Sequence, residues 1–260
     1  MIGGIKMRRI HLSFIFILII GIFLTLGCLV QEIMSQETSK GSESKSIQLP
    51  NPRYDSETSI EKALSLRRSI RAYSEEPLSV SEISQILWAA QGITKKMETA
   101  PATFKYKWQG GYRTAPSAGA LYPLEVYVAV GNVEGLSKGF YRYIPQTHSL
   151  EKKDEGDLRA NISDAALKQD SIKKGAAVIV IAAIFERTSV KYGERTERYV
   201  HIEVGHAVEN VYLQGISLGI GTVMIGAFND EAVQNVLHLP KEEHPLAIMP
   251  LGKIPKQAEK

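Results

Sequence analysis

The sequence of 260 residues contains a single cysteine, Cys28, and only two tryptophans. One cysteine cannot form an intrachain disulfide, so the core must stabilise the fold without covalent cross-links. It also excludes the zinc site of the nucleobase deaminases, which needs paired cysteines beside a motif such as His201-Ile202-Glu203. No glycine-rich loop ends in Gly-Lys-Ser or Gly-Lys-Thr, and this excludes a P-loop. The length and the hydrophobic content of 44% are those of an ordinary globular protein with one main domain.

Acidic residues are absent from the first 30 positions, although the whole chain has 31 basic residues, 28 acidic residues and a formal net charge of +3. Lys6, Arg8 and Arg9 lie in this stretch and account for the whole excess. The remainder of the chain is neutral. A neutral domain has no general electrostatic attraction for a polyanion, so we do not expect nucleic acid as a partner.

Charged residues of either sign are absent from positions 10–30. This run is long enough for a membrane span, which needs about 20 apolar residues. A basic flank before an apolar run is typical of a secretory signal or an uncleaved anchor whose basic end stays in the cytoplasm. Residues 1–30 are therefore predicted to bring the protein to a membrane, with the domain on the extracytoplasmic face.

Cys28 follows Gly27 at the end of the apolar run, an arrangement that resembles a bacterial or archaeal lipoprotein signal. Thr25 departs from that pattern, because these signals prefer an aliphatic residue three positions before the cysteine. A cleaved signal peptide, a lipoprotein signal lipidated at Cys28 and a retained membrane anchor therefore all remain open.

Residues 31–58 are rich in Ser, Glu, Lys and Gln, have no apolar periodicity, and are predicted to form a flexible tether. The folded domain is predicted to span residues 59–260. In this domain Ser79 and Glu82 form a capping box at the start of a helix that Gly92 ends. The pattern also predicts strands at 124–130, 176–185 and 246–251, a hairpin at 140–151 and a long buried helix at 199–218. Hairpins mixed with helices favour an α+β fold.

Three glycines, Gly219, Gly221 and Gly226, invite comparison with a dinucleotide-binding fingerprint. The predicted helix precedes them and a strand follows, which is the reverse of the order that the fingerprint needs. We therefore expect a tight turn from helix to strand. His201 and His206 are five residues apart on this helix, about 140° around its axis, so no metal site is expected.

A cluster of cations follows the first predicted helix, where Arg67, Arg68 and Arg71 surround Ser69. Three guanidinium groups and a hydroxyl within about one turn suit a phosphate monoester, because the donor fork of arginine matches phosphate oxygens. Charge clusters at helix ends are also commonly solvated surface. The cluster alone leaves both interpretations open.

Five segments, in this order and spacing, resemble the nitroreductase family of FMN-dependent oxidoreductases. They are residues 67–73, 116–125, 139–143, 218–228 and 250–253. The resemblance covers essentially the whole domain. The stretch Pro-Ser-Ala-Gly-Ala-Leu-Tyr-Pro and the later Tyr-Arg-Tyr are particularly similar to the SagB-type dehydrogenase branch, whose best-known members are azoline oxidases.

The resemblance implies an α/β sandwich of the α+β class, in which helices flank a central, mostly antiparallel sheet. It also implies a homodimer that binds FMN at the subunit interface with residues of both chains. The positions that match the family's phosphate and ribityl contacts are Arg67, Arg68, Ser69, Arg71, Gly252 and Lys253, with Lys256 as an alternative to Lys253. The positions that match contacts to one face of the isoalloxazine ring are Pro116, Ser117, Ala118 and Gly119, and those that match the other face and edge are Ile225, Gly226 and Ala227.

Gly226 departs from many nitroreductases, which have a glutamate there, and is similar to the SagB-type branch instead. Specificity for nitro compounds is therefore not expected. We call residues 116–119 the ring loop. Tyr112, Arg113 and Tyr122 border it and are candidate substrate contacts, with packing around a dimer groove as the alternative. No residue is identified as a general acid or base.

The resemblance implies transfer of hydride or electrons through the flavin N5, between a donor such as NAD(P)H and a small organic acceptor. Two alternatives stay open. One is a sensing or binding module that holds flavin without turnover. The other is an azoline dehydrogenase that acts on a modified peptide, which would require a companion cyclodehydratase and a precursor peptide.

Overall fold

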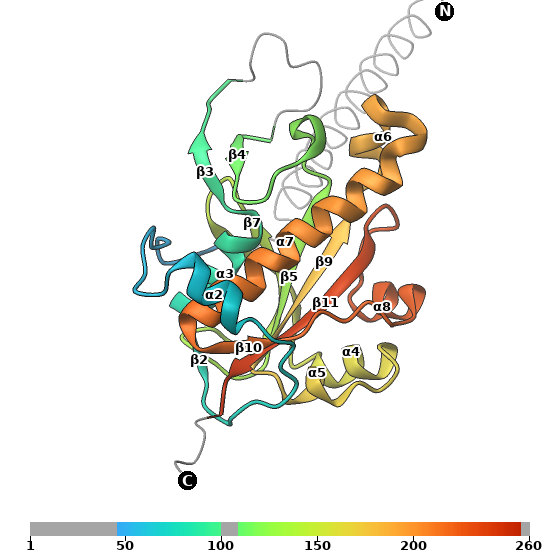
Figure 1. Cartoon of the computed structure of the whole chain (residues 1–260). Helices are drawn as coiled ribbons and strands as arrows, with labels where there is room; N and C mark the ends of the chain where they lie inside the picture. Colours follow the sequence, from blue (N-terminus) through green and yellow to red (C-terminus); the bar gives the residue numbers. More distant parts are fainter. Residues whose placement is uncertain (1–45, 100–108, 256–260) are drawn as a thin grey trace, which may run out of the picture. The chain divides into compact units, whose positions relative to one another are not determined.

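A seven-stranded sheet forms the centre of the computed structural model, which describes residues 46–99 and 109–255 (Figure 1). In spatial order its strands are β1 (Ser46–Gln48), β8 (Ser149–Glu155), β7 (Gly139–Ile144), β5 (Leu124–Val130), β9 (Ala177–Ala183), β11 (His244–Lys253) and β10 (Ile220–Thr222). Every neighbouring pair is antiparallel. Smaller sheets in the described ranges pair β2 (Leu78–Ser79) with β6 (Val133–Glu134) and β3 (Ile93–Lys96) with β4 (Gly111–Arg113).

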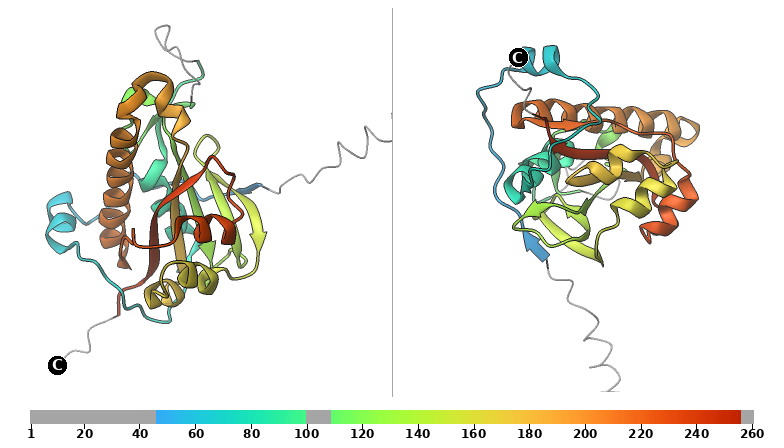
Figure 2. Two further views of the ribbon diagram at one scale, coloured as in Figure 1. Left: turned by 90° about the vertical axis from the view of Figure 1, so that its right-hand side faces the viewer. Right: turned by 90° about the horizontal axis from the view of Figure 1, so that it is seen from below.

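Helices cover both faces of the large sheet (Figures 1 and 2). They are α2 (Ile60–Leu66), α3 (Val80–Gln91), α4 (Arg159–Ala165), α5 (Asp170–Lys174), α6 (Glu186–Tyr192), α7 (Thr196–Leu218) and α8 (Asp230–Val236), with short 3₁₀ turns η1 (Ala118–Ala120) and η2 (Gly193–Arg195). Helices α3 and α7 pack on one face, and α4, α5 and α8 pack on the other. This arrangement confirms the expected α+β sandwich with an antiparallel sheet.

The central strands β5 and β9 are buried along their whole length because both of their faces are covered. Alternate residues of β9 enter different cores: Ile179 and Ile181 face α3 and α7, whereas Val178 and Val180 face α4, α5 and α8. The capping box that opens α3 is also present, since Ser79 accepts a hydrogen bond from the Glu82 backbone and Glu82 accepts one from that of Ser79.

The folded part reaches further toward the N-terminus than the sequence pattern indicates. Residues 46–48 form β1 and pair with β8, and Leu49 is buried. Gln85 then binds both backbone groups of Arg53, accepting from its N–H at 2.8 Å and donating to its oxygen at 3.1 Å. An edge strand is held by backbone hydrogen bonds, which need no apolar periodicity, so the pattern of 31–58 did not reveal it.

The predictions for residues 1–45, a membrane-associated segment and most of a tether, lie outside the described residues and stay predictions. In the described ranges, none of the helices has both the length and the apolar character of a membrane span.

Gly221 and Gly252 lie opposite each other on β10 and β11 and let another part of the chain approach closely. A Cβ on Gly221 would lie 2.7 Å from Ile70 Cγ2, and one on Gly252 would lie 2.6 Å from Tyr73 Cβ. The approaching segment is held by a hydrogen bond of 2.8 Å from Ile70 N to the oxygen of Thr222. The glycine pair therefore fixes residues 70–73 against the edge of the sheet.

We expect Gly252→Ala to destabilise the fold by about 1–3 kcal/mol, because the new methyl group would overlap a buried part of Tyr73 close to the backbone. Urea denaturation followed by circular dichroism would measure the change. Gly205→Ala is the matched control, since no atom lies within 4 Å of a Cβ placed on this exposed glycine of α7. Equal stability of the wild type and Gly252→Ala would contradict the close approach.

Candidate functional site

The segments that carry the predicted phosphate and ring-face contacts lie at two levels along α7 (Figure 1). The cationic segment, residues 67–71, contacts Tyr212 in the C-terminal half of the helix. The ring loop instead lies beside α6 and Glu203 in the N-terminal half. Nine residues separate Glu203 from Tyr212, which is about 13 Å along a helix. A single chain therefore presents these residues as two separate groups, one around Tyr212 and one around the ring loop.

Tyr212 holds the cationic segment in place. The guanidinium carbon of Arg67 lies 5.3 Å from the centre of the Tyr212 ring, and Ser69 Oγ lies 3.2 Å from the Tyr212 hydroxyl. The same hydroxyl accepts a hydrogen bond of 2.7 Å from the backbone N–H of Met224. Tyr212 therefore joins the predicted phosphate contacts to residues 224–227, which include the predicted contacts to the ring edge.

Arg68 has a different role from its neighbours. Its Nη1 atom donates hydrogen bonds to the backbone oxygens of Ser65, at 3.2 Å, and Arg67, at 2.7 Å. These bonds satisfy carbonyl groups at the C-terminal end of α2, which lack helical partners. Arg71 is exposed on the same segment. Arg67 and Arg71 are thus better placed than Arg68 to meet a phosphate.

Lys253 forms an ion pair with Glu82, the capping-box glutamate of α3. Burial raises the pKa of Glu82, but the hydrogen bonds from Lys253 and Ser79 outweigh it and hold this pKa below its usual value. The charge of Lys253 is therefore already compensated within the chain. Lys256, the alternative candidate, lies outside the described residues. The other matched residue of this strand, Gly252, packs against Tyr73.

The predicted ring-edge residues divide between core and surface. Ile225 is 4% exposed and exchanges two backbone hydrogen bonds with Ile248, so its side chain belongs to the core. Gly226 and Ala227 are exposed, and the nearest atom to a Cβ on Gly226 would be the sulfur of Met224, 3.7 Å away. The space beside Gly226 could therefore admit the edge of a planar ring.

The ring loop has a constrained backbone. Gly119 has a φ of 63°, and the non-glycine residues Ala120 and Tyr122 also have positive φ values of 54° and 46°. Ser117 Oγ accepts a hydrogen bond of 2.8 Å from the backbone N–H of Tyr122 and so closes the turn. Left-handed non-glycine residues cost of order 1–3 kcal/mol and are concentrated at functional sites.

Lys191 and Tyr192 lie against the ring loop, although the sequence did not single them out. A Cβ on Gly119 would be 2.9 Å from the Tyr192 hydroxyl and 3.0 Å from Lys191 Nζ. These residues lie in a polar stretch with no motif, and the turn from α6 into α7 brings them over the loop. Both are candidates to exchange a proton with a ligand held there.

Glu203 is a buried acid beneath the ring loop. It is 2% exposed, and no hydrogen bond to its Oε1 atom occurs within the described residues. Burial raises the pKa of Glu203 to about 7, against the opposing effects of Ser117, Arg113 and Gln91. The sequence analysis considered Glu203 only as part of the His201-Ile202-Glu203 motif, which was excluded as a zinc site. It did not identify Glu203 as a buried acid, because a helical pattern does not show which polar residue faces inward.

The three candidate substrate contacts differ in accessibility. Tyr112 is 47% exposed, whereas Arg113 is 9% and Tyr122 3% exposed. The guanidinium carbon of Arg113 lies 4.5 Å from the centre of the Tyr122 ring, and its Nη1 donates to Gln91 Oε1 at 2.9 Å. Tyr122 therefore packs inside the fold, and only Tyr112 offers its side chain freely to solvent.

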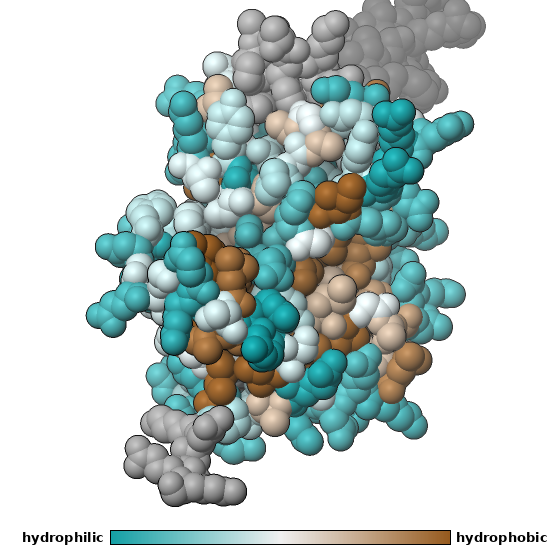
Figure 3. Space-filling view, viewed as in Figure 1, coloured by the Kyte–Doolittle hydropathy of each residue, from teal (hydrophilic) through white to brown (hydrophobic). Residues whose placement is uncertain are grey.

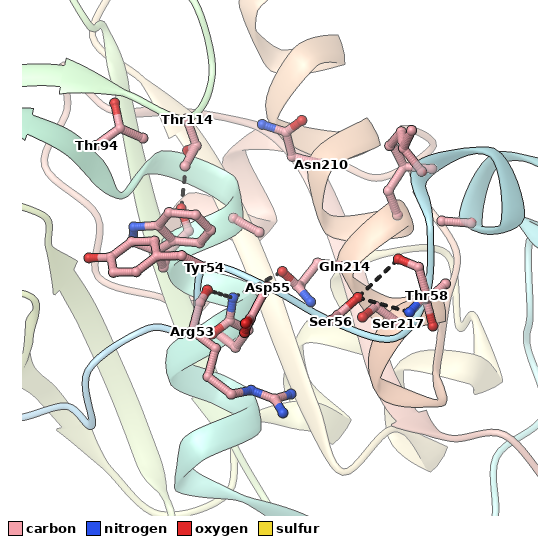
Figure 4. Close-up of a pocket in the computed structure, with 16 residues that line it drawn as sticks. Arg53, Tyr54, Asp55, Ser56, Thr58, Thr94, Thr114, Asn210, Gln214 and Ser217 are labelled. Carbon is pink, nitrogen blue, oxygen red and sulfur yellow. Dashed lines mark hydrogen bonds between the residues drawn. The ribbon is translucent and has the colours of Figure 1, made fainter.

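A cavity of about 480 Å³ between α3 and α7 does not contain any of these predicted residues (Figure 4). It lies between α3, α7 and the segment that leads into α2, and Tyr54, Asp55, Asn210 and Gln214 line it. Tyr54 makes an edge contact with Trp88 inside it, with ring centres 5.6 Å apart. Its lining contains no group that suggests catalysis. In the described ranges no three His, Cys, Asp or Glu side chains form a cluster able to hold a metal ion.

Comparison with known proteins finds a matching family model and several similar proteins and structures. The family model described as "Nitroreductase family" matches residues 64–253. The nitroreductase-family protein MJ1384 of Methanocaldococcus jannaschii is 44% identical over 207 residues, covering 80% of this chain and 96% of MJ1384. The crystal structure of a nitroreductase-family protein from Ralstonia eutropha JMP134 has a TM-score of 0.68 and 29% identity, covering 84% of this chain and 93% of that one. The microcin B17-processing protein McbC of Escherichia coli is 27% identical over 150 residues, covering 55% of this chain and 54% of McbC.

The raised pKa of Glu203 predicts how stability changes with pH. Its value rises from 4.5 to about 7 on folding, so its contribution is full below pH 4.5 and is lost as the pH rises through 7. Relative to Glu203→Gln, the wild type should lose up to about 3 kcal/mol of unfolding free energy between pH 4.5 and pH 8.

Urea denaturation of both proteins at pH 5 and pH 8 would test this effect. Glu197→Gln, at an exposed position in the first turn of α7, is the control and should follow the wild type at both values. A difference between the wild type and Glu203→Gln that does not change with pH would show that folding does not raise the pKa of Glu203.

Proposed function

The chain belongs to the nitroreductase family of oxidoreductases, and on that basis we propose that it binds FMN and transfers electrons from NAD(P)H to a small organic acceptor. The observation that carries this proposal is the cluster around Tyr212. It collects Arg67, Ser69 and the segment containing Gly226 into one half-site.

The chemistry of this half-site fits a flavin mononucleotide. Arg67 and Arg71 supply guanidinium donors for a phosphate, and the Ser69 hydroxyl is a donor and acceptor for a ribityl chain. Gly226 leaves space for the edge of a flat ring, because a Cβ there would contact only a methionine sulfur. In this proposal Arg67 and Arg71 bind the FMN phosphate, and the backbone at Gly226 and Ala227 orients the flavin ring.

FMN supplies reversible hydride and electron transfer at N5 when it is bound. The chain's own part is then to exclude water from the ring, orient it and move protons. The small residues of the ring loop allow a close approach to one ring face. Lys191 and Tyr192, beside Gly119, are placed to give or take the proton that accompanies hydride transfer.

We propose that two copies of the chain complete each site. The half-sites lie at different levels along α7, so the ring loop of one chain is available to the Tyr212 cluster of another. An apolar surface supports this pairing: Ile60, Leu64 and Leu66 of α2 are each 46–55% exposed beside the large cavity. Figure 3 shows apolar surface over this part of the molecule. A symmetric dimer would bury the same patch on both copies.

A second activity has specific support. The similarity to McbC favours the alternative of a dehydrogenase that oxidises a heterocycle in a modified peptide. The match covers about half of McbC, so we place this activity second. A flavin-binding module without turnover is the remaining alternative. Anaerobic mixing with NADPH separates it from the NAD(P)H-dependent oxidoreductase, because only an enzyme that accepts this donor would bleach the flavin.

We expect the purified protein to be yellow, with the absorption bands of oxidised FMN, and Arg67→Ala/Arg71→Ala to lose most of this colour because the phosphate loses its two guanidinium partners. FMN released by heat and measured by fluorescence gives the stoichiometry. Arg68→Ala is the matched control and should keep its FMN, since Arg68 binds carbonyl groups of α2. A colourless wild type that takes up no added FMN would refute the proposal.

The shared site predicts complementation between two inactive variants. Arg67→Ala/Arg71→Ala lacks one half-site, and Gly119→Leu blocks the other through its overlap with Tyr192 and its left-handed backbone. Random mixing of the two should restore about a quarter of the sites, because one of the two sites in each mixed dimer is intact. NADPH oxidation after co-refolding measures this recovery. Activity no higher than the sum of the separate variants would place both half-sites on the same chain.

A further inference from the structure

A polar cavity of about 310 Å³ lies where strands β5 and β7 of the sheet separate. Strands β5 and β7 pair from Tyr127 and Arg142 to Val130 and Gly139. Beyond this register, residues 124–126 and 143–144 line the cavity instead of pairing with each other. Its volume is at the lower end of the range of small-molecule sites, about 300–1,000 Å³.

The cavity has an excess of positive charge. Three guanidinium groups, from Arg113, Arg142 and Arg187, line it together with one carboxylate, that of Glu125. Glu125 is shared, since its oxygens lie 2.8 Å from Arg142 Nη2 and 2.5 Å from Arg187 Nη2. Two of the three arginines therefore share a single ion-pair partner.

Arg113 has no direct ion pair among the described residues. It is 91% buried, and its Nη1 atom bonds to the neutral side chain of Gln91. Its Nε atom has no hydrogen-bond partner within the described part of the chain. A guanidinium group that is buried and not paired favours the approach of an anion.

Two further acids lie near this cluster, but they offset its charge only in part. Glu203 faces Arg113 from below the ring loop, and Glu243 binds the Tyr127 hydroxyl at 2.5 Å near Arg142. Burial raises the pKa of both carboxyl groups, so each keeps a proton more readily than an ordinary glutamate. Among the residues that line the cavity itself, three guanidinium groups face one carboxylate.

Two of the arginines that line the cavity are linked to the ring loop. Arg113 lies three residues before Pro116, the first residue of the loop. Arg187 Nη1 donates a hydrogen bond of 3.1 Å to the backbone oxygen of Tyr122, whose own N–H binds Ser117. A charged group in the cavity would therefore contact arginines that are connected to the loop on which the proposed redox chemistry depends.

We propose that this cavity binds the carboxylate group of a small acidic molecule, which would make the physiological acceptor an organic acid. The fork of donors on arginine matches the two oxygens of a carboxylate. The neutral amides of Gln91, Gln109 and Gln146 complete a polar lining for the part of the ligand next to the charge. The assignment as acceptor site rests on the proposed oxidoreductase function, whereas the binding of the acid does not.

Calorimetric titration of the purified full-length chain with benzoate and with benzamide tests the charge requirement, because the two probes have the same size and differ in charge. We expect benzoate to bind about tenfold more tightly than benzamide, or about 1.4 kcal/mol. Arg113→Gln should reduce this preference to about threefold or less. Arg198→Gln, at an exposed position on α7, is the matched control and should keep the full preference.

Equal binding of the two probes by the wild type would overturn the inference, and so would a preference that survives in folded Arg113→Gln. If Arg113→Gln does not fold, Arg187→Gln is the second variant, since its more exposed guanidinium group also lines the cavity.

Titration of the Arg67→Ala/Arg71→Ala protein separates this inference from the proposed function. A benzoate preference without FMN supports the cavity on its own. Loss of the preference in a wild type that still binds FMN refutes the cavity alone.

Discussion

The close approach of residues 70–73 to Gly221 and Gly252 is the constraint on which the candidate site depends. Any larger residue at either glycine would push this segment away from the sheet. Because the segment lies flat there, Arg67 and Ser69 reach Tyr212, and Tyr212 in turn holds the backbone at Met224. Two glycines without polar side chains thus determine where the polar groups of the half-site are presented.

Helix α7 then sets the distance between the two half-sites, and its buried face carries the residues that each of them needs. Tyr212 serves the cationic segment, and Glu203 lies under the ring loop. Around the ring loop the chain retains two buried charged groups, Arg113 and Glu203, each of which has an atom without a hydrogen-bond partner among the described residues. Such groups lower stability in a fold with no other reason to keep them. Their position beside a strained loop therefore indicates that they serve the site.

The sequence predicted the elements whose patterns are local. The apolar strand at 124–130 and the capping box at Ser79 depend on neighbouring residues and are present. Strand β1 was missed, because backbone pairing gives no side-chain signal. The roles of Lys253, Glu203 and Ile225 depend on residues far along the chain, Glu82, Ser117 and Ile248. A family resemblance can indicate which positions matter, but it cannot show that a lysine is already paired or that an isoleucine points into the core.

The same segment that presents the arginines also protects the sheet. Strand β10 is an outer strand, and the bond from Ile70 N to Thr222 O occupies part of its free edge. At the opposite side of the sheet, β1 pairs with residues 149–151 of β8. The rest of β8, residues 152–155, has no pairing with β1 and consists of charged residues. Unpaired edges are templates for aggregation. Displacement of residues 70–73 would therefore leave the edge of β10 unpaired and prone to aggregation. Because the same segment presents the arginines proposed to bind the ligand, retention of the ligand is linked to the resistance of the protein to aggregation.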